Sequence, residues 1–103
     1  MNVNKLMKQA QKMQEKMAQA QADLAEKTVE AEAAGGKVTV VANGAGDVVS
    51  IKIAKEIVDP DDVEFLEDAV LSGVQRAIER GKAIATSEMS KLTEGMGVPG
   101  LGL

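Results

Sequence analysis

The chain has 103 residues, 45% of them hydrophobic, with Phe65 as its only aromatic residue and with no cysteine or histidine. That composition excludes disulfide bonds, zinc sites built from thiolates or imidazoles, and acid–base catalysis by histidine. The net charge of −4 is unevenly placed, because residues 1–22 hold four lysines against the single acid Glu15, whereas residues 56–68 hold seven acids and no base. We therefore expect one domain without a metal, a cofactor or an enzymatic activity.

Residues 3–27 are predicted to form one long helix, capped by Asn2 or Asn4, because the segment is rich in Ala, Gln, Lys, Met and Glu. At 1.5 Å per residue such a helix extends about 37 Å. The remaining part of the chain, roughly 75 residues, would form a globule only about 29 Å across. We therefore expect the helix to project beyond its own domain.

One face of this predicted helix carries apolar residues that are alternately three and four positions apart. This is the a/d spacing of helices that pack against a partner helix, and it predicts a dimer interface. The same spacing also allows packing on the last helix of the same subunit, so both partners remain open. The predicted interface residues are Leu6, Met13, Met17 and Leu24.

A second face of the helix carries a stripe of lysines, with acids nearly absent beside it. Such a stripe is typical of a surface that contacts phosphates, although lysines also commonly serve only to solvate an exposed helix face. A smaller basic cluster on the last predicted helix is a secondary candidate, with salt bridges to nearby acids such as Glu79 as the alternative. The candidate DNA-binding residues are Lys5, Lys8, Lys12 and Lys16 on the first helix, and Arg76, Arg80 and Lys82 on the last.

Three short strands are predicted in the middle of the chain, over residues 28–34, 38–42 and 49–53. Apolar and polar residues alternate in the first and third, and the second is a β-branched run. Gly35 and Gly36 provide one turn, and Asn43–Asp47 has the composition of a hairpin turn. The segment is expected to form a three-stranded antiparallel sheet.

The last helix is predicted to open at Asp59 as N-cap with Pro60 in its first turn. Gly73 and Gly81 are unfavourable inside a helix, so they indicate close packing on the sheet or on a partner. The helix completes a domain over residues 1–94. Residues 95–103, rich in glycine, are predicted to form a flexible tail.

The order of these features resembles the YbaB/EbfC family of bacterial nucleoid-associated proteins. The resemblance covers essentially the whole chain and is carried by the first helix, by residues 35–46, by Leu66-Glu67-Asp68 and by the Gly-Met-x-x-Pro-Gly-Leu pattern of residues 95–101. It implies an α+β homodimer with an α-β-β-β-α element order and a tweezer-like outline, which binds double-stranded DNA through its terminal helices. Many members have Asn-Asp-Ala where this chain has Gln75-Arg76-Ala77.

The sequence thus favours a nucleoid-associated homodimer in the cytoplasm that grips duplex DNA, mainly through phosphates and with weak sequence preference. No membrane and no small-molecule substrate is expected as a partner. The first alternative is a coiled-coil interaction protein such as a prefoldin-like chaperone, in which the last helix would pair along the whole first helix. A second alternative is a helix lying on a membrane surface, for which a face of mainly Ala and Met is a weak anchor.

Overall fold

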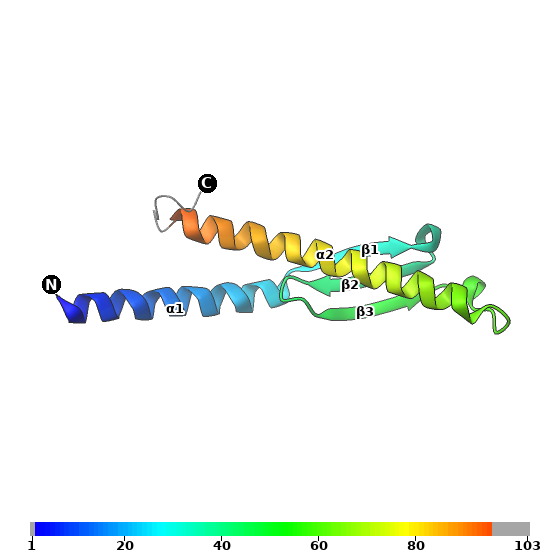
Figure 1. Cartoon of the computed structure of the whole chain (residues 1–103), viewed down its shortest axis with the longest axis horizontal. Helices are drawn as coiled ribbons and strands as arrows, with labels where there is room; N and C mark the ends of the chain where they lie inside the picture. The colour runs from blue at the N-terminus through cyan, green and yellow to red at the C-terminus, as the bar shows by residue number, and fades with distance from the viewer. Residues whose placement is uncertain (1, 96–103) are drawn as a thin grey trace.

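The computed structural model describes residues 2–95, apart from the side chains of residues 93 and 95. Its elements follow the predicted α-β-β-β-α order (Figure 1): α1 (Val3–Glu26), β1 (Thr28–Ala33), β2 (Val38–Asn43), β3 (Val48–Ile53) and α2 (Val63–Gly95), with short 3₁₀ turns at Ala34–Gly36 and Lys55–Ile57. The α+β fold is therefore confirmed. The predicted flexible tail, apart from Gly95 at the end of α2, lies outside the described residues.

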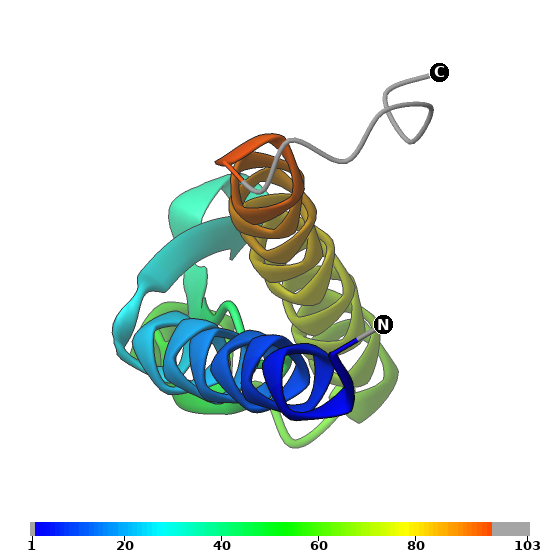
Figure 2. The same cartoon turned by 90° about the vertical axis from the view of Figure 1, so that its left-hand side faces the viewer.

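Helix α1 projects from the rest of the chain, as its length predicts. The backbone N–H of Lys5 donates to the Asn2 side chain at 3.2 Å, so Asn2 is the N-cap. The chain extends 71 × 25 × 17 Å, and the long dimension is largely α1 and the far half of α2, which both leave the sheet in the same direction (Figure 1). Seen from that side, the two helices diverge as two separate arms (Figure 2).

The sheet has the strand order β1-β2-β3, with antiparallel pairing throughout. The β2–β3 turn contains Gly46 at φ +94°, a backbone conformation that glycine adopts without strain. Asn43 organises this turn, because its side-chain oxygen accepts from the N–H groups of Ala45 and Asp47 at 3.0 Å each. Its side-chain nitrogen donates to the Ala25 carbonyl at 3.2 Å, which ties the turn to the base of α1.

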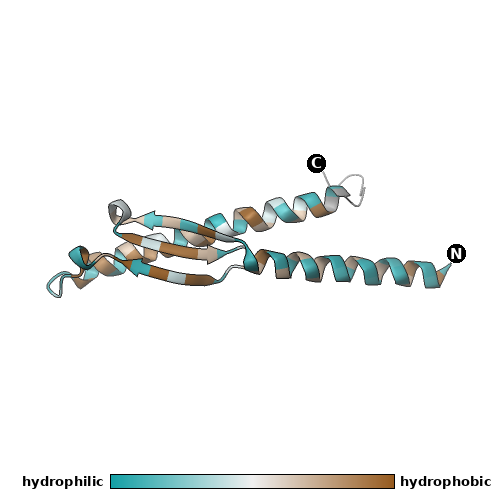
Figure 3. Cartoon of the chain, turned by 180° about the vertical axis from the view of Figure 1, so that it is seen from behind, coloured by the Kyte–Doolittle hydropathy of each residue, from teal (hydrophilic) through white to brown (hydrophobic). Residues whose placement is uncertain are grey.

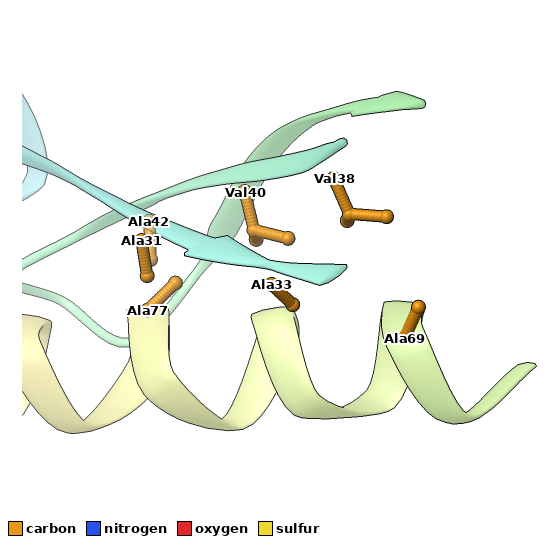
Figure 4. Close-up of a cluster of buried hydrophobic side chains, with 7 residues drawn as sticks. All are labelled: Ala31, Ala33, Val38, Val40, Ala42, Ala69 and Ala77. Carbon is orange, nitrogen blue, oxygen red and sulfur yellow. The ribbon is translucent and has the colours of Figure 1, made fainter. Parts of the chain in front are cut away.

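Helix α2 packs across β1 and β2 through very small side chains (Figure 4). A Cβ at Gly73 would lie 2.8 Å from Val40 Cγ2, and one at Gly81 would meet the Asn43 carbonyl oxygen. These glycines therefore mark close packing on the sheet, which is one of the two options that the sequence left open. The main cluster of buried hydrophobic side chains consists of Ala31, Ala33, Val38, Val40, Ala42, Ala69 and Ala77.

The start of α2 differs from the prediction. The helix begins at Val63, and the backbone N–H of Phe65 donates to Asp62 Oδ1 at 3.3 Å. Asp59 instead closes a turn, since its side chain accepts from the N–H of Asp61 at 2.9 Å. The prediction was wrong by about one turn because Asp59-Pro60 fits the start of a β-turn as well as it fits the start of a helix.

Leu24 is not available to a partner subunit, contrary to its assignment to the dimer interface. Its side chain is 1% exposed and lies against Gly44 in the turn that joins β2 and β3. The Gly44 N–H also donates to the Leu24 carbonyl at 2.9 Å. The apolar spacing of α1 therefore continues into the core of its own subunit, where the first helix meets the sheet.

Candidate nucleic-acid interface

The four lysines of α1 are all exposed on the projecting arm: Lys5, Lys8, Lys12 and Lys16. The ion pairs of the described residues are Lys27–Glu88 and Lys37–Glu56, so none of the described carboxylates forms a salt bridge with the stripe. From Lys5 to Lys16 the helix rises about 17 Å, the length over which one DNA strand presents about five phosphates. The stripe is therefore long enough to contact a row of about five phosphates along one DNA strand.

Opposite charges occupy opposite ends of the molecule. The acidic segment 56–68 surrounds the start of α2, at the far end of the sheet from the α1 arm (Figure 1). Of its seven acids, Glu56 is paired with Lys37 at 2.5 Å. A polyanion would therefore be attracted to the arm and repelled from the other end.

The far half of α2 forms a second, nearly neutral arm beside α1. Lys27 bridges to Glu88 at 2.6 Å across the gap, and this hydrogen bond holds the pKa of the exposed Glu88 carboxyl below its usual value. A groove of about 390 Å³ separates the arms and includes both Lys16 and Lys91 in its lining. Sequence reasoning did not single out Lys91, and only the approach of the two helices places it near the stripe.

Arg76 and Arg80 lie at the free edge of β1, away from the α1 stripe. Arg76 Nη1 donates to the Glu32 carbonyl at 2.8 Å, and Arg80 Nη1 donates to the Glu30 carbonyl. The described residues show no salt bridge from either arginine to Glu79, which was the alternative role considered. Lys82 is exposed and lines a shallow groove with Arg76 on the outer side of α2. The predicted basic residues thus form two separate groups.

A large apolar face is left uncovered beside β3, which is exposed along its whole length. Ile51 and Ile53 are paired with Val40 and Val38, so they point to the same face as the core, but α2 covers β3 much less than it covers β1 and β2. They remain 42% and 39% exposed, and Leu71 of α2 is 55% exposed. Between β3 and α2 runs an apolar groove of about 490 Å³, and Figure 3 shows hydrophobic residues along this strand.

Other kinds of site are not found in the described part of the chain. Within residues 2–95, no three side chains of the metal-ligating types converge. Neither described helix is both long and apolar enough to cross a membrane.

Comparison with known proteins places this fold in a family. The model of the YbaB/EbfC DNA-binding family matches residues 1–96, so the chain belongs to that family. A nucleoid-associated protein of Acetivibrio thermocellus is 54% identical over 97% of this chain and 89% of its own length. A nucleoid-associated protein of Ruminiclostridium cellulolyticum is 50% identical over 97% of this chain and 88% of its own.

A solved structure supports the fold independently. The crystal structure of the uncharacterized protein HP0035 from Helicobacter pylori superposes with a TM-score of 0.69 over 95% of this chain and 99% of that one. At 20% sequence identity this similarity concerns the fold alone. The element order of the described residues and the family membership therefore agree with the resemblance drawn from the sequence.

Proposed function

We propose that this protein binds double-stranded DNA at the nucleoid through the cationic α1 arms of a homodimer. The observation that carries the proposal is the α1 stripe, Lys5, Lys8, Lys12 and Lys16, exposed on a helix that projects from the sheet. Phosphate contacts of this kind position a protein on DNA without reading its bases, so sequence preference is weak. Family membership and the names of the relatives support DNA as the ligand.

Arg76, Arg80 and Lys82 are proposed as secondary phosphate contacts. A guanidinium has five N–H donors, and each arginine uses Nη1 on a β1 carbonyl, so further donors can face a phosphate. Because Arg76 and Arg80 lie at the β1 edge and not on the projecting α1 arm (Figure 1), these residues would contact only DNA that continues from the arm along the sheet.

The ionic strength dependence of binding tests the phosphate mechanism. If a dimer engages about 6–8 phosphates, log Kobs should fall against log salt with a slope near −5 to −7. The measurement is fluorescence anisotropy of a labelled duplex over a series of salt concentrations, with an unrelated duplex of equal length to check sequence preference. A slope near zero would rule out the phosphate mechanism.

The homodimer is proposed to form through the uncovered face of β3 and α2. The other candidate surface is the apolar face of α1 formed by Leu6, Met13, Met17 and Leu24, the α1 seam. Burying apolar surface is the main source of association free energy, and this face presents a continuous apolar groove beside Leu71 and Ile53. On the α1 seam, Leu24 is buried within its own subunit and cannot contact a partner. Leu6 and Met17 are half exposed on the arm, and Met13 is partly buried. Joining two subunits at β3 leaves both arms free for DNA.

A pair of matched substitutions distinguishes the two interfaces. Leu71→Glu places a charge in the proposed β3–α2 interface and should convert the dimer to monomer at micromolar concentration, because a buried unpaired carboxylate costs several kcal/mol. Met17→Glu places the same charge on the α1 seam and should leave the dimer intact. Light scattering coupled to size-exclusion chromatography gives both masses. The reverse pattern would place the interface on the seam.

The prefoldin-like alternative is not supported by the geometry. It requires the last helix to pair along the whole first helix, whereas α2 packs across β1 and β2 and diverges from α1 (Figure 2).

A further inference from the structure

Strand β1 is an edge strand, because it is paired with β2 on one side only. The unpaired backbone groups of an edge strand can pair with a strand of another molecule, and natural proteins protect such edges. In an antiparallel strand, the N–H and C=O of one residue point to the same side, and successive residues alternate. The carbonyls of Glu30 and Glu32, which the arginines reach, therefore belong to the set that points away from β2.

The spacing of the two arginines matches the spacing of these carbonyls. Arg76 and Arg80 are four residues apart on α2, a rise of about 6 Å, and two residues along β1 advance about 6.6 Å. Each arginine therefore reaches one outward carbonyl, Glu32 for Arg76 and Glu30 for Arg80. A groove of about 690 Å³ runs beside this edge, lined by both arginines, both glutamates, Gly35, Gly36 and Ala33.

We infer that Arg76 and Arg80 close the β1 edge against antiparallel pairing with β1 of a second copy. The guanidinium groups occupy the acceptors that an incoming strand needs, and they lie in the groove that its backbone would enter. The partner is another copy of this chain, because its β1 presents the same outward acceptors and donors and can pair symmetrically with this one. Pairing at β1 would join dimers into larger species, since the proposed dimer uses the opposite side of the sheet.

Removing both guanidinium groups tests this inference without DNA. The double variant Arg76→Gln/Arg80→Gln should self-associate, with its mass rising about twofold over wild type in light scattering at equal concentration. The matched control Lys82→Gln/Lys91→Gln removes two positive charges from the same helix and should keep the wild-type mass. In the associated double variant, the amide hydrogens of Glu30 and Glu32 should become protected from exchange with solvent.

A third variant separates strand pairing from misfolding. Glu30→Pro in the double-variant background removes an outward N–H at an edge position where proline is tolerated, and should restore the wild-type mass. An unchanged mass for the double variant would overturn the inference. So would association without protection of the two amides, or association that persists in the proline variant.

Discussion

Gly81→Ala should strongly destabilise the protein, although the same substitution usually stabilises a helix. Alanine is favoured over glycine in a helix interior by about 1 kcal/mol. Here the new Cβ would meet the carbonyl oxygen of Asn43, a backbone atom rather than a flexible side chain. Asn43 cannot easily move, because its side chain holds the β2–β3 turn and the base of α1. The helix must therefore shift away from the sheet.

The expected loss is about 2–3 kcal/mol of unfolding free energy, or a fall of about 10–20 °C in Tm at fixed protein concentration. Thermal unfolding followed by circular dichroism measures it. Ser87→Ala, an exposed substitution in the same helix, is the matched control and should be neutral or slightly stabilising. The stability of Gly73→Ala should lie between the stabilities of Gly81→Ala and Ser87→Ala. The new Cβ at Gly73 would meet the side chain of Val40, which can change its rotamer, rather than a backbone atom. Equal stability of Gly81→Ala and Ser87→Ala would contradict the described packing.

Most of the fold could be predicted from local signals, because the sequence of each helix, strand or turn contains a signal for that element. The helix-forming composition and the Asn2 cap define α1, and the turn of residues 43–47 joins two strands close to their predicted bounds. The start of α2 was misplaced because Asp59 and Asp62 are both good capping residues, and only the tertiary path of the chain selects Asp62. Competing local signals of equal strength are not resolved by the sequence alone.

The candidate sites were harder to predict, because they depend on which surfaces meet. Leu24 fits the apolar spacing of the α1 seam, and that spacing is the same whether the partner is another subunit or the hairpin of the same subunit. Ile51 and Ile53 alternate with polar residues as in any half-buried strand, so nothing in the sequence reveals that α2 leaves them largely uncovered. The backbone carbonyls that receive Arg76 and Arg80 have no sequence signature at all.

A second large effect, a loss of DNA affinity, is expected when the positive charges of the α1 stripe are removed. The lysines of this stripe account for most of the proposed phosphate contacts. Each contact contributes about 0.9 to the slope of log Kobs against log salt. The variant dimer loses these lysines from both arms, so binding should weaken by at least about 10³-fold near 0.1 M salt, the loss that three or four contacts alone would cause. Changing Lys5, Lys8, Lys12 and Lys16 to glutamine removes these charges while keeping residues that favour helices. Because all four are exposed on the arm, the fold should remain intact.

A matched pair of smaller variants controls for net charge alone. Lys5→Gln/Lys8→Gln removes two charges from the tip of the arm, and Lys52→Gln/Lys55→Gln removes two exposed charges from β3 and the turn that follows it. Bulk electrostatics would weaken binding equally in both. Contact by the arm would weaken it only in the first.

The most direct test of the proposed mechanism is the affinity of the four-lysine variant for a long duplex at about 0.1 M salt, beside wild type and with the fold and mass of both checked. We expect a loss of at least about 10³-fold with the fold and the dimer unchanged. Binding by the variant with the affinity of wild type would contradict the account and would place the DNA contact away from α1.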